Sequence, residues 1–177
     1  MVKPILFVLG AIPVIVAILL AVPLVTKNEI PMSAANSFDT IEIEYTKHQL
    51  KKISNGIAER TGSQKTEILL IENNGKIKYT LTEKGYTQPD IKSKIDQKKL
   101  DKIKSLIKET GFITIDPESF TVLENATDYQ KSSVKITLNG RVNQIYWPES
   151  SATSDFIPPL ITLVESELDK IMSEISE

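Results

Sequence analysis

The sequence contains no cysteine and a single histidine, His48. Without cysteine there is no disulfide framework, thiol nucleophile or thiolate metal site. One histidine excludes a histidine-rich zinc or copper centre. A Ser-His-Asp triad would have to use His48, and no nucleophile-elbow motif, phosphate loop or dinucleotide fingerprint is present. A calcium site made of carboxylates alone stays open, although no EF-hand spacing occurs. These absences predict a protein that has no catalytic, metal or cofactor site and is not an enzyme.

A strong excess of either charge is also missing, since the formal net charge is −2. This balance argues against binding to nucleic acid. The charges are unevenly distributed, because residues 27–111 are mildly basic and residues 112–177 are clearly acidic. We expect a solvated surface whose two halves attract each other, and the alternative is a polarised face for a partner. The lysine-rich stretch Lys92–Lys108 is expected to form the solvated face of a helix.

A long apolar run extends over residues 4–25 and contains no charged side chain. A helix of this length, at about 1.5 Å per residue, spans roughly the 30 Å of a bilayer core. This predicts a retained membrane anchor, because the apolar region of a cleaved signal is usually about 7–15 residues long. The alternatives are a signal cleaved after Ala35, which follows Ser33 and Ala34, and a buried core helix.

We expect the remaining domain to lie outside the cytoplasm, as part of a single-pass membrane protein or, after cleavage near Ala35, as a secreted protein. The triplet Asn125-Ala126-Thr127 is a glycosylation acceptor pattern that would matter in that location. Glycosylation at Asn125 is therefore a further expectation.

Residues 26–39 are small and polar and predict a linker, which is followed by a single domain over residues 40–177. Alternation of apolar and polar residues predicts a strand over residues 40–47. Asn-Gly, the strongest short hairpin signal, separates two further pairs of predicted strands, 67–72 with 76–82 and 133–138 with 141–147.

Two amphipathic helices are predicted. The first covers residues 96–110, with Asp96 as its N-cap and Gly111 as its C-cap. The second covers residues 158–175, and its apolar stripe favours packing on a sheet over a coiled-coil seam. The stripes consist of Leu100, Ile103, Leu106 and Ile107 and of Ile161, Val164, Leu168, Ile171 and Ile175. The predicted fold is α+β, with an antiparallel sheet of about five strands and two helices packed on one face, in the order β-ββ-α-ββ-α.

Three segments carry a resemblance to a known group of domains: Ile95–Phe112, Asp128–Arg141 and Pro158–Ile161. Their hydrophobic spacing resembles that of emfourin-like domains, a group of small exported α+β domains. This group includes protein inhibitors of thermolysin-like metalloproteases, and relatives of unknown function. The resemblance implies an exported α+β fold and, as an alternative function, inhibition of a protease.

The best candidates for contact with a partner are the loop residues Asn55, Gly56 and Ile57, the pair Tyr146-Trp147, and the polar loop Glu149–Asp155 that follows this pair. Tyrosine and tryptophan near a loop are typical binding anchors, although packing of Trp147 in the core is the other interpretation. We therefore predict a membrane-anchored, non-catalytic domain that binds another protein or serves as an accessory subunit. A secreted soluble binding protein is the alternative, and a homo-oligomer stays open.

Overall fold

The computed structural model describes residues 38–54, 59–116 and 120–176. The predicted membrane segment, most of the linker and the loop residues Asn55, Gly56 and Ile57 lie outside the described residues. Among the residues that are described, no helix is both long and apolar enough to cross a membrane. The membrane anchor at residues 4–25 therefore stays a prediction.

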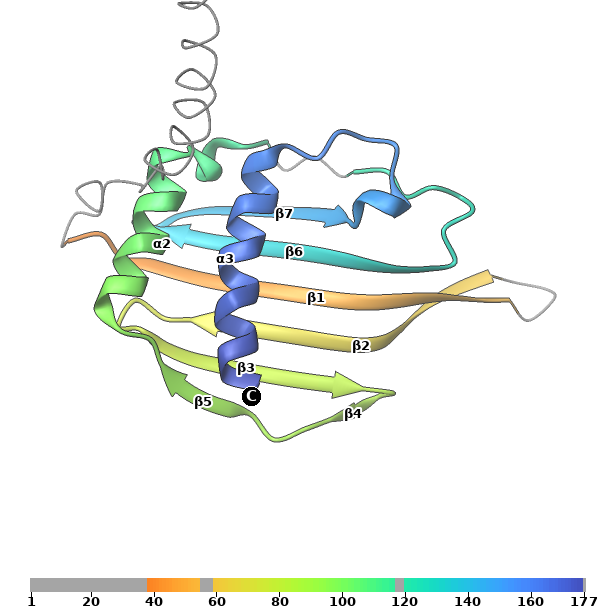
Figure 1. Ribbon diagram of the computed structural model, residues 1–177, viewed down its shortest axis with the longest axis horizontal. Coiled ribbons are helices and arrows are strands. Elements are labelled where there is room, and N and C mark those ends of the chain that lie inside the picture. Colours follow the sequence, from red (N-terminus) through yellow and green to blue (C-terminus); the bar gives the residue numbers. More distant parts are fainter. Residues whose placement is uncertain (1–37, 55–58, 117–119, 177) are drawn as a thin grey trace, which may run out of the picture. The chain divides into compact units, whose positions relative to one another are not determined.

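A seven-stranded antiparallel sheet carries two helices on one of its faces (Figure 1). The order across the sheet is β4-β3-β2-β1-β6-β7, and β5 pairs with β3. The strands are β1 (Ile41–Ser54), β2 (Glu59–Ile71), β3 (Lys76–Glu83), β4 (Tyr86–Thr87), β5 (Ile91–Lys94), β6 (Asp128–Leu138) and β7 (Arg141–Pro148). The helices are α2 (Gln97–Glu109) and α3 (Pro159–Ser176), with short 3-10 turns at η2 (Phe112–Thr114) and η3 (Ser150–Ala152). The predicted α+β class is confirmed, and β4 and β5 add to the five expected strands.

Strand β1 lies in the middle of the sheet, between β2 and β6. Its odd-numbered residues from Ile41 to Tyr45 are fully buried, whereas Glu42 and Glu44 are exposed on the opposite face. This alternation gives the sheet one apolar face, on which the helices pack. The strand continues to Ser54, beyond its predicted end at residue 47, because β2 and β6 supply backbone partners along this polar stretch.

Helix α2 covers Gln97–Glu109 and is one residue shorter at each end than the predicted 96–110, with Asp96 as the predicted N-cap. The Asp96 side chain accepts a hydrogen bond of 2.7 Å from the backbone N–H of Lys99. Gly111 follows the helix in the left-handed conformation, with φ of 67°. All four residues of the predicted apolar stripe of α2 are buried, and so are the first four of the α3 stripe. Helix α3 runs across the strands and packs on the sheet, as expected (Figure 1).

The prediction that the lysine-rich stretch forms only a solvated face is wrong. Lys104 is buried, and its ammonium group donates a 2.9 Å hydrogen bond to the backbone oxygen of Asp39. Other lysines of α2 form ion pairs with carboxylates of α3, at Lys99–Glu174 and Lys102–Glu167. The basic and acidic halves of the sequence therefore meet at the junction of the two helices, which is the attraction that the charge distribution predicts.

Both Asn-Gly hairpins are present, but their turns differ. Asn139 and Gly140 both have positive φ, of 51° and 79°, as a two-residue turn requires. In the other hairpin only Gly75 has positive φ, and its N–H donates to the Glu72 oxygen in a longer loop. The loop between β2 and β3 therefore has four residues, 72–75, and Asn74 does not adopt the positive φ that an Asn-Gly turn indicates.

Replacing Gly75 by alanine should lower the free energy of unfolding by about 2 kcal/mol. The backbone at position 75 has positive φ, which strains any residue except glycine. There is also no room for a methyl group, since an added Cβ would lie 2.9 Å from the backbone oxygen of Ile95. Gly140→Ala is the matched control, because Gly140 has the same φ of 79° and no atom within 4 Å of an added Cβ. Urea unfolding should give about half the loss for the control, and equal losses would contradict the role of the Ile95 contact.

Candidate functional site

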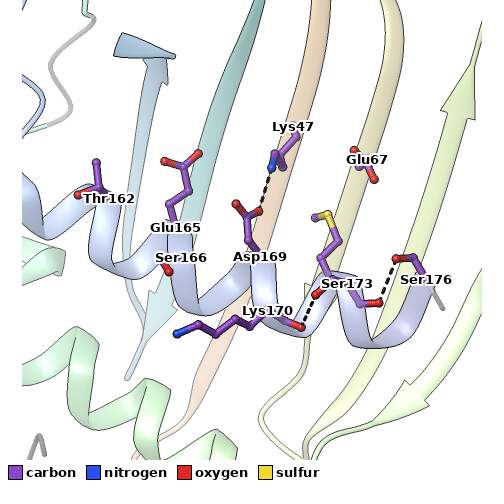
Figure 2. Close-up of a pocket in the computed structure, with 10 residues that line it drawn as sticks. Lys47, Glu67, Thr162, Glu165, Ser166, Asp169, Lys170, Ser173 and Ser176 are labelled. Carbon is purple, nitrogen blue, oxygen red and sulfur yellow. Dashed lines mark hydrogen bonds and ion pairs between the residues drawn. The ribbon is translucent and has the colours of Figure 1, made fainter. Parts of the chain in front are cut away.

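A hollow of about 610 Å³ lies along the side of helix α3, above strands β1 and β2 (Figure 2). We call it the α3 trough. It is lined by Lys47, Glu67, Thr162, Glu165, Ser166, Asp169, Lys170, Met172, Ser173 and Ser176. Most of the lining comes from α3, and the sheet supplies Lys47 and Glu67. The trough therefore exists because α3 covers only part of the sheet.

Two carboxylates of α3 point from the helix toward the sheet beside the trough (Figure 2). Glu165 and Asp169 are four residues apart and so lie one turn apart on the same helix face. Each directly follows a buried residue of the apolar stripe, Val164 or Leu168. This position at the border of the stripe brings polar groups to the boundary between the core and the trough.

The sheet supplies hydrogen-bond donors to both carboxylates. Glu165 accepts from the hydroxyl of Ser132 at 2.8 Å and from the indole N–H of Trp147 at 3.1 Å. Asp169 accepts from the phenol of Tyr45 at 2.8 Å and forms an ion pair of 3.0 Å with Lys47. These contacts join α3 to three neighbouring strands, β1, β6 and β7.

Tyr45 lies at the centre of this network and stays in its neutral form. Burial raises the pKa of its phenol well above the ordinary value, and the charges of Glu165 and Asp169 raise it further. Its hydroxyl group is therefore a permanent donor to Asp169. A group poised to exchange protons near neutral pH would suit acid–base catalysis, and Tyr45 is not such a group. The network instead fixes the position of α3 and the shape of the trough.

A second hollow, of about 430 Å³, continues from the first, and Thr162 and Glu165 line both. Its other lining residues are Gln130, Trp147, Pro148, Glu149, Ser150, Asp155, Phe156 and Ile157. Phe156 lines this hollow and is 79% exposed, so its ring is accessible to a binding partner. The lining of this second hollow contains three carboxylates and no lysine or arginine. The combined surface is a groove with more carboxylates than lysines and with one exposed aromatic ring, Phe156, in its lining.

Tyr146 and Trp147, both predicted as candidates for contact with a partner, lie on opposite faces of the sheet. Trp147 is buried beneath α3, as the core interpretation held, whereas the Tyr146 ring lies on the opposite face of the sheet. The ammonium group of Lys131 lies 5.9 Å from the centre of the Tyr146 ring.

Asn125 is exposed in a turn, and glycosylation of its side chain stays a prediction. Glu149, Ser150 and Asp155 of the loop predicted to contact a partner line the second hollow. The α3 residues of the groove were not predicted, although carboxylates spaced four apart beside an apolar stripe were the available signal.

His48 lies on the open face of the sheet, away from the groove. Its Nδ1 atom and the Thr66 hydroxyl are 2.9 Å apart and share a hydrogen bond. Partial burial lowers the pKa of His48 below its ordinary value of 6.5, and the charge of Lys131 lowers it further. His48 is therefore hydrogen-bonded by the neighbouring strand β2.

This environment predicts how stability depends on pH. The unfolded chain takes up a proton at His48 more readily than the folded chain does. The free energy of unfolding should therefore decrease as the pH falls below about 6.5 through the folded-state pKa. Because His48 is the only histidine, its NMR titration is unambiguous. Lys131→Gln should raise its pKa, and His48→Gln should flatten the pH dependence of unfolding in this range. An unchanged His48 pKa in Lys131→Gln would contradict the contribution assigned to the charge of Lys131.

Within the part of the chain that the structure describes, no group of three or more histidine, aspartate or glutamate side chains is placed to hold a metal ion. No protein-family model matches the chain, and a search of curated proteins gives no significant match. The resemblance to emfourin-like domains therefore stays a prediction.

Proposed function

We propose that this chain is a membrane-anchored binding domain that lies outside the cytoplasm and holds a partner protein in the groove beside α3. Residues 4–25 provide the anchor and residues 26–39 the tether. The domain works without a catalytic step. The observation that carries the binding part of the proposal is the exposed Phe156 ring in the acidic lining of the second hollow.

The chemistry of the groove favours binding over catalysis. Its central carboxylates, Glu165 and Asp169, are already engaged by donors of the sheet. Tyr45 is held neutral beside them by burial, which raises its pKa. The polar groups at this surface are hydrogen-bonded within the protein, and an aromatic side chain beside them is exposed. Such a combination is typical of protein interfaces, in which a few aromatic residues supply most of the binding energy.

The charges of the groove indicate the kind of partner. The second hollow is lined by the carboxylates of Glu149, Asp155 and Glu165, without a lysine or arginine. A partner segment that carries an apolar residue for Phe156 and a basic residue for these carboxylates would fit this surface. Association should then weaken with rising salt, because the carboxylates at the rim attract the partner through solvent.

Photo-crosslinking in native membranes tests this proposal. A benzoylphenylalanine residue would replace Phe156 in one full-length variant and Tyr86 in another. Tyr86 is the matched control, since it is 81% exposed, close to the 79% of Phe156, and lies at the other end of the sheet on β4. The proposal predicts one discrete adduct from position 156 and none of the same mass from position 86. Equal labelling at both positions, or no adduct at position 156, would contradict it.

A further inference from the structure

Within residues 38–54, 59–116 and 120–176, strand β7 forms one edge of the sheet. Among the described strands it pairs only with β6. The two-residue turn at Asn139-Gly140 makes Leu138 and Arg141 a hydrogen-bonded pair. Along an antiparallel hairpin, hydrogen-bonded pairs alternate with pairs whose backbone groups do not bond each other. The N–H and C=O groups of Val142, Gln144 and Tyr146 therefore point away from β6. None of the backbone hydrogen bonds that the described residues make outside their helices and strands involves these three residues.

The opposite edge of the sheet is built differently. There β4 and β5 are two and four residues long, and the exposed β5 carries Lys92 and Lys94. Short strands and lysines are common protections of a sheet edge against pairing with another chain. Strand β7 has eight residues, and its apolar side chains Val142 and Tyr146 are 60% and 44% exposed on one face. Of the two edges, β7 is thus the one suited to accept a further strand.

We propose that β7 pairs with β7 of a second copy of this chain, antiparallel and around a two-fold axis at Gln144. In this register Gln144 lies opposite Gln144 of the second copy, and Val142 lies opposite Tyr146. All three outward-facing residues of each strand then have partners, which gives about six backbone hydrogen bonds across the axis. Shifting the strands by two residues would leave some of these groups unpaired. The contact is isologous, because each copy uses the same strand.

The side chains of β7 complement one another in this register. Each Val142 meets a Tyr146 ring, and aromatic pairs with β-branched residues are favourable across antiparallel strands. Arg141 begins β7 and Glu149 follows it, so antiparallel pairing brings Arg141 of one copy diagonally close to Glu149 of the other, about 7–8 Å between backbones. Within the described residues Arg141 forms no ion pair of its own. Self-pairing would therefore supply this arginine with a carboxylate.

The pairing goes beyond the proposed binding function and does not depend on it. In such a dimer the two sheets form one continuous sheet, and the helices of both copies lie on the same face, because the two-fold axis is perpendicular to the strands and to the sheet. The groove beside α3 would then occur twice on one side of the assembly.

Cysteine crosslinking of the full chain in mild detergent tests the register. The natural chain has no cysteine, so each introduced thiol reports alone. Gln144→Cys should form a disulfide dimer on oxidation with copper phenanthroline. Residues in a hydrogen-bonded antiparallel pair have Cα atoms about 5.5 Å apart, which a disulfide can bridge. Lys92→Cys, at the opposite sheet edge, is the control and should stay monomeric.

A second pair of variants distinguishes this register from others. Val142→Cys and Tyr146→Cys should each fail to crosslink alone, because each thiol lies about 14 Å along the strand from its own copy. Mixed together, they should crosslink. Crosslinking of Val142→Cys alone would contradict the register, and a Gln144→Cys adduct with another protein in place of a dimer would overturn the proposal.

Sedimentation of the unmodified full chain gives a readout that needs no cysteine. The proposal predicts a dimer at micromolar concentration. It also predicts a monomer for the double variant Val142→Lys with Tyr146→Lys, because like charges would then face each other across the axis. Leu163→Lys, on the exposed side of α3, should leave the dimer intact. A monomeric unmodified chain, or a dimer that persists in the double variant, would overturn self-pairing through β7.

Discussion

Replacing Glu165 by alanine is expected to lower the free energy of unfolding by about 3 kcal/mol, because it leaves buried donors without an acceptor. Ser132 and Trp147 are both buried, and each donates to Glu165. A buried donor that loses its partner costs about 1–3 kcal/mol, and two such donors are affected. Water in the neighbouring trough offsets part of this loss, since Glu165 itself is half-buried.

Urea unfolding measures this effect, and the emission of Trp147, the only tryptophan, reports on the site directly. Ser166→Ala is the matched control, because Ser166 is the next residue of α3 and is exposed. The control should change the free energy of unfolding by less than about 0.5 kcal/mol. If Glu165→Ala were equally harmless, and left the tryptophan emission unchanged, the network would not hold α3 on the sheet.

The second large effect is expected for Asp39→Ala, which should also cost about 3 kcal/mol. The buried carboxylate of Asp39 accepts from the Lys108 ammonium group at 2.5 Å and from the Asn139 side chain at 2.8 Å. Asp39 thereby links the start of β1 to α2 and to the turn between β6 and β7. Its removal leaves a partly buried lysine charge without its counter-ion.

A double-mutant cycle tests this assignment. Lys108→Met alone removes the ammonium group, and combining it with Asp39→Ala should recover part of the loss, because no uncompensated charge then remains. Thermal unfolding of the four variants gives the coupling energy. Strictly additive losses would show that the ion pair between Asp39 and Lys108 does not contribute.

The helices could be predicted from sequence because their signals are local. Asp96 and Gly111 mark the ends of α2 through backbone chemistry that depends on neighbouring residues alone. The buried stripes also follow from a period of 3.6 residues. The hairpins were found for the same reason, although the turn at Gly75 closes a longer loop than the Asn-Gly pair indicates.

The strand extensions and the short edge strands depend on partners that are distant in sequence. Residues 49–54 of β1 are mostly polar, and their two apolar residues, Leu50 and Ile53, do not alternate with polar ones as in a strand. They are extended because β2 and β6 lie on either side. Strand β5 is exposed throughout and is held by its pairing with β3. Tertiary pairing rather than residue preference determines such segments.

The loop Glu149–Asp155 was predicted as a contact surface, and three of its residues line the groove. The α3 side of the groove was missed because its residues look like ordinary surface in the sequence. Glu165 and Asp169 are two of several acidic residues on α3, and only the register of the sheet shows that Tyr45, Ser132 and Trp147 lie beneath them. Lys104 was assigned to solvent for the same reason. Its carbonyl partner at Asp39 lies 65 residues away in the sequence.

The central claim, that a membrane holds this domain through residues 4–25, is tested most directly by the mature N-terminus. The full chain would be expressed with a C-terminal tag, and the cell membranes would be isolated and washed with alkaline carbonate. The mass of the tagged protein, determined by mass spectrometry, then gives its first residue. The account predicts a chain that begins at Met1 or Val2 and stays in the washed membrane. A soluble chain that begins at Asn36 would contradict the anchor and would show that the domain is released.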